Sequence, residues 1–393
     1  MNFAKSPPTV IFAGNPIRYQ IYRTTGEAQP TGTNGVGIMV VDKDGVFMGE
    51  DLKPVNNLNT FDFDISDYLN AEFANLTPPR FQLVPTGGIY LFLYADLIKK
   101  YRILAGYHGP GGITVALYDD YHWAIAGGLS REAMVVWNAT ANGFWADINN
   151  KKRFLTWHPL VKKTSRTNHE SLYFFSQYSD VTEYHVKIQA TKSDGTTTTA
   201  ELIHLHNSTQ YIVFELIVGY GQMNIETLAG AQVNSWKVWI ENQGGTKISE
   251  ERTFVIDEKY HEYSREFVFR NSFAVYDYYR FTGKHEKNLE YEREILSVYS
   301  PDGETYYNAP QRAVKILESQ TFKASSGWVS KAQLDYLREF MLSMEIYEII
   351  SERPWRVNIT SKKTNKYLVD GEYLYSLEFE YERAYTDNFY STI

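Results

Sequence analysis

Two histidines separated by one residue, His204 and His206, are the side chains best placed for metal chemistry in this sequence. Alternate side chains of a β-strand share a face, so this spacing would set two imidazoles side by side as metal ligands. No third ligand stands at a recognisable spacing, and a polar strand face accounts for the pair as well. The sequence therefore predicts no metal and no cofactor, and it leaves open whether His204 and His206 bind a metal.

The segment Asp42-Lys43-Asp44-Gly45 begins like a calcium-binding loop. Such a loop needs oxygen ligands at later positions, where this chain has residues such as Phe47 and Leu52. Asp and Gly between two apolar runs are typical of a β-hairpin turn. We therefore expect a hairpin turn here and no calcium site.

Several aspartates could supply the paired carboxylates of a glycoside hydrolase. They are Asp62, Asp64, Asp67, Asp119 and Asp120. Acidic residues that alternate with apolar ones along a strand more often form its solvated face. The chain also lacks the phosphate-loop, HExxH and GxSxG motifs, and it has no cysteine. The sequence thus predicts no enzymatic activity and no catalytic residue.

The composition favours a β-rich protein with extensive interfaces. Aromatic residues make up 16% of the 393 residues, with 31 Tyr, and aromatic side chains favour strands and the centres of protein interfaces. The net charge of −8 argues against nucleic acid and against an anionic membrane surface as partners. Because the start has no signal-peptide pattern and no apolar run is long enough to cross a membrane, we expect synthesis and retention in a cytoplasm.

Strand-like segments divide the chain into four parts. The spacing of alternating segments predicts an N-terminal β-sandwich over residues 1–110 and a connecting segment over 111–150. About seven further strands predict a fibronectin-like sandwich over 151–260, with Asp194-Gly195 as a hairpin turn. Residues 261–393 form an α+β module. The fold class predicted is mainly β, with tandem immunoglobulin- or fibronectin-like sandwiches followed by this module.

One amphipathic helix is predicted in the C-terminal module, from Ser330 to about Tyr347. Ser330 and Gln333 have the spacing of a capping box. The expected apolar face consists of Leu334, Leu337, Met341 and Met344. An aromatic strand from Tyr373 to Tyr381 follows it.

The aromatic residues also supply candidates for binding. Tyr278, Tyr279, Tyr385 and Tyr390 are candidate interface residues, because they stand at segment ends or opposite an apolar alternation. Trp137 and Trp145 are candidates for stacking on a sugar ring under the alternative function of glycan binding.

Four stretches carry a resemblance to a known family. They are LYDDYHWAIAGGLSRE (Leu117–Glu132), FLTWHPLVKK (Phe154–Lys163), EFVFRNSFAVYDYYRFTG (Glu266–Gly283), and the ending from Trp328 to Tyr385. Together they resemble tail and baseplate structural proteins of tailed bacteriophages and their prophages. The order of an N-terminal β-domain, a GGLS segment, a fibronectin-like domain, a helix and a final aromatic strand is similar to that family.

The resemblance implies a virion structural component at the tail tip or baseplate, assembled as a symmetric oligomer around the tail axis. Its partners would be copies of itself and other tail proteins, after synthesis in the host cytoplasm. The position stays open between distal tail, baseplate wedge, neck collar and receptor-binding roles. The alternative is a receptor- or glycan-binding tail protein with a host surface glycan as partner.

Overall fold

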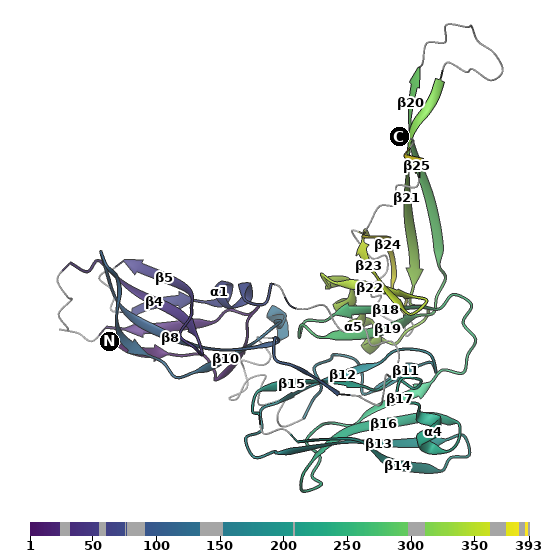
Figure 1. Cartoon of the computed structure of the whole chain (residues 1–393), viewed down its shortest axis with the longest axis horizontal. Helices are drawn as coiled ribbons and strands as arrows, with labels where there is room; N and C mark the ends of the chain where they lie inside the picture. The colour runs from purple at the N-terminus through teal and green to yellow at the C-terminus, as the bar shows by residue number, and fades with distance from the viewer. Residues whose placement is uncertain are drawn as a thin grey trace. The chain divides into compact units, whose positions relative to one another are not determined.

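The computed structural model divides the chain into two compact units, both coloured along the chain in Figure 1. It describes residues 1–23, 32–54, 60–74, 76, 91–133, 152–206, 209–297, 311–361, 375–384 and 390–391, with the backbone alone at 312–317 and 390–391. The first unit comprises Met1–Ile256 and Asn271–Asp277, and the second Asp257–Arg270 and Tyr278–Ile393. Strands far outnumber helices, which confirms the predicted mainly-β class. None of the described helices has the length and apolarity needed to cross a bilayer.

The first part of unit 1 contains two sheets. The larger has the order β2 (Val10–Phe12), β10 (His122–Ile125), β8 (Ile98–Gly109), β4 (Gly35–Asp42) and β5 (Phe47–Pro54), with β9 (Gly112–Tyr118) also paired to β8. The smaller has the order β1 (Asn2–Lys5), β3 (Arg18–Tyr22) and β6 (Thr60–Asp64), and the short helix α1 (Ser66–Ala71) follows β6. Because β9 and β10 lie within residues 111–150, the segment expected to be a connection supplies two strands of the larger sheet.

Local patterns explain these elements. In β6, Phe61 and Phe63 are buried while Asp62 and Asp64 are exposed, so the predicted solvated acidic face is confirmed. Between β4 and β5, the Asp42 carboxylate accepts the N–H groups of Asp44 and Val46, each at 2.8 Å. This is the predicted hairpin turn.

The second part of unit 1 is a β-sandwich. Its larger sheet has the order β11 (Val161–Thr164), β17 (Arg252–Ile256), β16 (Val233–Asn242), β13 (Glu183–Lys192) and β14 (Thr197–His206). Its smaller sheet has the order β12 (Ser171–Ser176), β15 (Ile212–Ile217) and β7 (Leu91–Tyr94), and α4 (Ile225–Ala229) lies between β15 and β16 in sequence. The sandwich predicted over 151–260 thus also includes β7, which comes from well before those residues.

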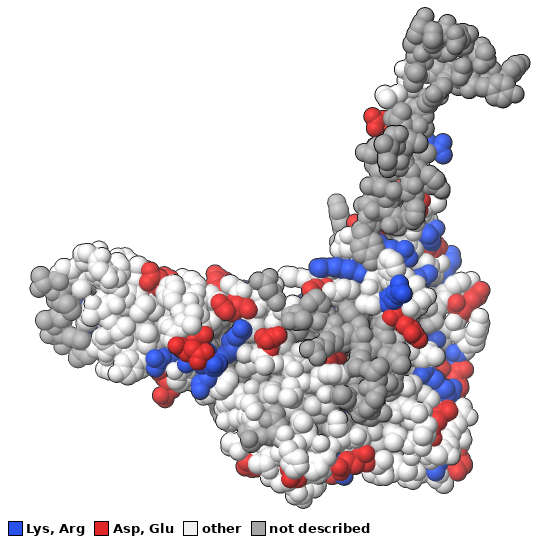
Figure 2. Space-filling model, viewed as in Figure 1, with Lys and Arg blue, Asp and Glu red and all other residues white. Residues whose placement is uncertain are grey.

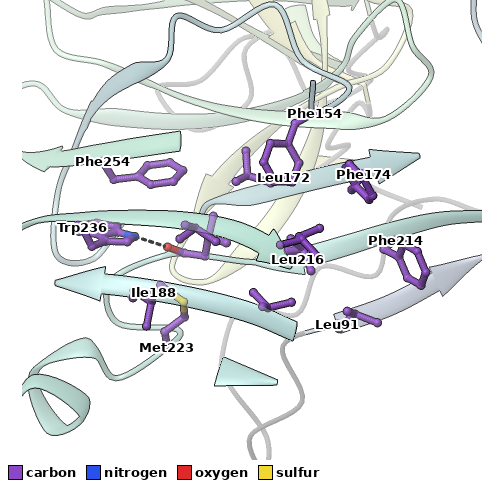
Figure 3. Packing of buried hydrophobic residues seen from close by; sticks show 14 of the residues in the cluster. Leu91, Phe154, Leu172, Phe174, Ile188, Phe214, Leu216, Met223, Trp236 and Phe254 are labelled. Carbon is purple, nitrogen blue, oxygen red and sulfur yellow. Dashed lines mark hydrogen bonds between the residues drawn. The ribbon is translucent and has the colours of Figure 1, made fainter. Parts of the chain in front are cut away.

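The core of this sandwich lies between the two sheets, as Figure 3 shows. Trp236 from β16 is fully buried and stacks on Phe254 at 5.2 Å between ring centroids. Its indole N–H donates to the Val218 carbonyl at 3.1 Å, the dashed line in Figure 3, so its single polar atom is satisfied. Phe174 and Phe214 approach from the facing sheet. Alternation along β13 supplies the inward row, which the sequence predicted.

Unit 2 is one sheet covered by a helix. The strand order is β19 (Tyr276–Phe281), β18 (Arg265–Arg270), β22 (Ile346–Ile350), β23 (Arg353–Ile359), β24 (Glu378–Arg383), β21 (Gln311–Ser325) and β20 (Glu286–Ser297), with β25 (Tyr390–Ser391) paired to β21. The first two residues of β19 are assigned to unit 1. Helix α5 (Lys331–Leu342) packs Phe340 against Phe267, Phe281 and Phe379. The aromatic residues of this part of the sequence therefore form the hydrophobic core of unit 2.

The predicted start of helix α5 is confirmed, and its predicted end is wrong. The Ser330 side chain accepts the Gln333 N–H and the Gln333 side chain accepts the Ser330 N–H, which completes the capping box. The helix stops at Leu342, because Ser343 is extended and Ile346 begins a strand paired with β18. Met344, expected on the buried face, is 93% exposed.

Candidate functional site

In unit 2, β20 and β21 pair as a long two-stranded ribbon (Figure 1). β20 has 12 residues and β21 has 15. β24 pairs with β21 only from Thr321 to Ser325. Beyond that point β21 pairs with β20 and, at two residues, with β25. The ribbon therefore extends past the body of its sheet.

All 12 residues of β20 are exposed. The period of two along the strand places Leu289, Tyr291, Arg293 and Ile295 on one face, and the three apolar residues have exposed fractions of 42%, 56% and 56%. The opposite face carries three glutamates, Glu290, Glu292 and Glu294. No other described strand pairs with the outer edge of β20. A two-stranded ribbon is marginal alone in water, and a free edge with an apolar row favours pairing with another chain.

A second candidate is a cluster of histidine and glutamate on the hairpin of β13 and β14 in unit 1. The turn at Asp194-Gly195 is the predicted one, with Gly195 at φ +84°. Across the hairpin, His185 pairs with His204 and Glu183 with His206. We call these four residues the histidine–glutamate cluster.

The cluster depends on a β-bulge. Pairing from the turn runs in register as far as Lys187 opposite Glu201, and then shifts so that Val186 faces Ile203. Leu202 is the extra residue, and both Leu202 and Ile203 are partly buried against the core. Without this shift, His204 and His206 would lie on the opposite face from His185, because one residue of slip reverses the side-chain direction.

The polar atoms of the cluster converge on one carboxylate. Glu183 Oε2 lies 3.5 Å from His185 Nε2 and 3.3 Å from His204 Nε2. Glu183 Oε1 lies 3.4 Å from His206 Nδ1. The rings of His185 and His204 stack with centroids 4.3 Å apart. Sequence reasoning found His204 and His206 but missed Glu183 and His185, which only the cross-strand register reveals.

A further carboxylate borders the cluster. Glu201 Oε2 lies 3.1 Å from His185 Nδ1 and accepts a hydrogen bond from Lys187 Nζ at 2.5 Å. The hydrogen bond from Lys187 is the main cause that lowers the pKa of Glu201, followed in the same direction by His185. Glu201 is therefore a carboxylate at neutral pH and orients the His185 ring.

A third polar group lies buried in unit 1, around the loop Asn271–Asp277. Asn271 Nδ2 donates to the Leu155 carbonyl at 3.0 Å and to Asp277 Oδ2 at 2.9 Å. Asn271 Oδ1 accepts the N–H groups of Phe273 and Val275. Thr156 Oγ1 donates to the same Asp277 oxygen at 3.0 Å. We call Thr156, Asn271 and Asp277 the buried network, and its atoms are occupied by the chain itself.

The aspartates considered for hydrolysis all lie in the first part of unit 1. Asp64 accepts hydrogen bonds from Ile17 N–H and from Ser66. Asp67 is exposed at the start of α1, as Asp120 is beyond β9. Asp119 Oδ2 lies 2.9 Å from Nε2 of the buried His122, whose Nδ1 lies 3.1 Å from the Pro8 carbonyl. His122 thus has both ring nitrogens engaged in packing the strand and offers none to a substrate.

Two of the four candidate interface tyrosines are inside the protein. Tyr278 is 5% and Tyr279 is 8% exposed, so the expectation that they form an interface is corrected. The physical reason is that Tyr279 packs on Phe281 and on Tyr336 of helix α5, which covers this part of the sheet. Tyr385, and the Trp137 and Trp145 proposed for glycan stacking, lie outside the described residues. Only the backbone of Tyr390 is described, in β25.

Basic and acidic side chains are interspersed on the face drawn in Figure 2, without an extended patch of one sign. The charge distribution on this face therefore indicates no additional binding site. No family model matches the chain, and no curated protein matches it either.

Solved structures give weak likenesses. The chain is similar to Drosophila OTK, extracellular domains 3–5, with a TM-score of 0.23 and 8% identity over 82% of this chain and 91% of that one. It is also similar to the full extracellular region of Plexin A4, with a TM-score of 0.19 and 8% identity over 98% of this chain and 40% of that one. The chain thus spans less than half of the plexin structure. TM-scores this low assign the chain to no family.

Proposed function

We propose that this chain is a structural component of a phage virion, at the tail tip or baseplate, which assembles as a symmetric oligomer with copies of itself and other tail proteins. The observation that carries the assembling role is the exposed β20–β21 ribbon. The assignment to a phage tail rests on the sequence resemblance. The sequence has no cysteine and none of the phosphate-loop, HExxH and GxSxG motifs, which favours a non-catalytic role.

The ribbon supports assembly through its chemistry. Leu289, Tyr291 and Ile295 leave apolar surface that the described residues do not cover, with Arg293 on the same face. Burying such a row removes apolar surface from water, at about 25 cal/mol per Å². The free edge of β20 can add backbone hydrogen bonds to the same contact. A neighbouring copy is the proposed occupant.

A ring needs a contact between two different surfaces, repeated by a rotation that closes. An extended arm on each copy that reaches a different surface on the next copy meets this requirement. The acidic row of Glu290, Glu292 and Glu294 would then stay in water and oppose sheet-to-sheet aggregation on that face.

The first experiment measures self-association by multi-angle light scattering across a concentration series. Replacing Leu289 and Ile295 together by Lys is expected to weaken association at least tenfold, because it places charges in the apolar row. Met344→Lys is the matched control, since Met344 is exposed in the same unit but away from the ribbon. Equal association of the ribbon variant and the wild type contradicts the assigned interface.

The second experiment images the intact particle by electron microscopy. The proposal expects three or six copies of this chain around a tail axis, with β20 against a neighbouring copy. A chain absent from every virion or injection-type assembly, or present as one unrepeated copy, contradicts the structural role. Tight binding of the isolated chain to host surface polysaccharide, lost in Trp137→Ala or Trp145→Ala, would favour the glycan-binding alternative.

A further inference from the structure

We infer that the histidine–glutamate cluster is a binding site for a divalent transition metal ion of the zinc class, with Glu183, His185, His204 and His206 as its four ligands. Imidazole nitrogen and carboxylate oxygen are ligands that zinc accepts in tetrahedral sites. Two residues come from β13 and two from β14, so the ion would join the two strands of one hairpin.

The distances between the rings and the carboxylate match those between neighbouring ligands of a tetrahedral ion. Ligand atoms bound at about 2.0–2.2 Å around a tetrahedral ion lie about 3.3–3.6 Å apart. The nitrogens of His185 and His204 lie 3.5 and 3.3 Å from Glu183 Oε2, whereas that of His206 lies 3.4 Å from the other oxygen, Oε1. The ligand atoms of Glu183, His185 and His204 all lie within 4.8 Å of one another. His206 lies outside this group of three, so its ring must move closer to become the fourth ligand.

Glu201 provides the outer partner that a metal-bound histidine needs. With its proton on Nδ1, His185 donates to Glu201 Oε2 at 3.1 Å and turns the lone pair of Nε2 toward Glu183. Metal-ligating histidines commonly donate their other ring N–H to a carboxylate in this way. Lys187 holds that carboxylate in turn, at 2.5 Å. The orientation of His185 is therefore set by the protein before any ion arrives.

The arrangement favours a metal over a set of plain ion pairs. Three imidazolium rings with centroids 4.3 and 4.5 Å apart would repel one another around one carboxylate. Three neutral rings and one carboxylate around a divalent cation have no such conflict. The bulge at Leu202 turns His204 and His206 onto the same face as Glu183 and His185, a re-aiming of side chains that bulges often provide beside functional sites.

Four protein ligands leave no open position for water or substrate, so the site is structural in type. His206 is the outermost ligand, with 72% of its side chain exposed, and gives the ion a path from solvent. The effect expected is a tighter β13–β14 hairpin, because only the folded register brings the four ligands together.

The test titrates the full-length, chelator-treated chain with ZnCl₂ by isothermal calorimetry. One equivalent is expected to bind, and the thermal midpoint of unfolding is expected to rise with it. His204→Ala and His204→Gln are expected to weaken binding at least 100-fold, and the outer-partner variant Glu201→Gln 10- to 100-fold. The glutamine variant keeps a polar side chain of similar size, and circular dichroism verifies that each variant is folded.

His261→Ala is the matched control, because His261 also pairs with a carboxylate, Asp257, at 2.8 Å but does not belong to the histidine–glutamate cluster. Its affinity is expected to equal that of the wild type. Cobalt(II) as a second probe should give the intense visible absorption of a tetrahedral ion. The inference is overturned by less than one equivalent of zinc, by unchanged affinity in both His204 variants, or by the weak spectrum of octahedral cobalt.

Discussion

The buried network and the histidine–glutamate cluster both bring a carboxylate into contact with several polar side chains. They differ in whether those contacts are enclosed in the protein interior or open to solvent. At Asp277, two donors from the chain meet one oxygen in a fully enclosed place. At Glu183, three ring nitrogens converge in a place that solvent reaches. Burial makes an unpaired polar atom costly, so the interior selects closed networks. Convergent polar atoms at a surface carry no such requirement, and are better candidates for binding.

The largest expected effect is in the buried network. Asn271→Ala removes two donated and two accepted hydrogen bonds. Asp277 keeps the bond from Thr156, while the N–H groups of Phe273 and Val275 lose their acceptor. The free energy of unfolding is expected to fall by about 3–5 kcal/mol, in the range seen when a buried network is broken. Urea unfolding followed by tryptophan fluorescence measures it. A loss below about 1 kcal/mol would show that the loop is not held by this side chain.

A smaller loss is expected at the edge of the same network. Thr156 Oγ1 donates to Asp277 and accepts the N–H of His158 at 3.1 Å. Thr156→Val keeps the shape and removes both bonds, which is expected to cost about 2 kcal/mol. Comparing this variant with Asn271→Ala in the same unfolding assay ranks the two residues. A cost equal to that of Asn271→Ala would contradict the central position of Asn271.

Asp277→Asn tests the charge in the network. Burial raises the pKa of Asp277, opposed by the hydrogen bond from Asn271 and by Lys162. Since the unfolded carboxyl titrates near about 3.9, the folded state holds the extra proton above that pH. The contribution of this group to stability is therefore present below about pH 4 and is lost as pH rises through the folded pKa.

We expect Asp277→Asn to change stability at neutral pH by no more than about 1 kcal/mol, because amide and carboxyl have the same shape. The main result is a flatter dependence of stability on pH above about pH 4. Urea midpoints at several pH values measure it, with Asp62→Asn as the control, since Asp62 is exposed on β6. An unchanged pH dependence would contradict a titrating Asp277.

The parts of the fold that follow from local sequence were predictable. Ser330 and Gln333 lie three residues apart, and their capping box requires only that spacing. Asp194-Gly195 forms the hairpin turn because Gly tolerates the positive φ found there. The end of helix α5 was not predictable, because no Gly or Pro marks it. Pairing of Ile346 with Phe269 in β18 decides it instead.

The sites depended on pairing that the sequence does not display. β20 reads as a charged segment with scattered apolar residues, and only its register with β21 makes it a long strand. The two histidines of β14 suggested a metal pair, but the third and fourth ligands required both the register and the bulge at Leu202. A single residue of slip would have placed the histidines on opposite faces.

The smallest expected effect completes the comparison between the two clusters. In chelator-treated protein, His204→Ala is expected to change the free energy of unfolding by no more than about 0.5 kcal/mol, because surface ion pairs contribute little. His204 is a polar residue of an exposed strand face, and its contact with Glu183 is screened by water. The urea assay used for Asn271→Ala measures both variants under the same conditions. A metal-free loss of about 2 kcal/mol or more would mean that His204 supports the fold by itself, as Asn271 does, and the contrast between a closed interior network and an open surface cluster would fail.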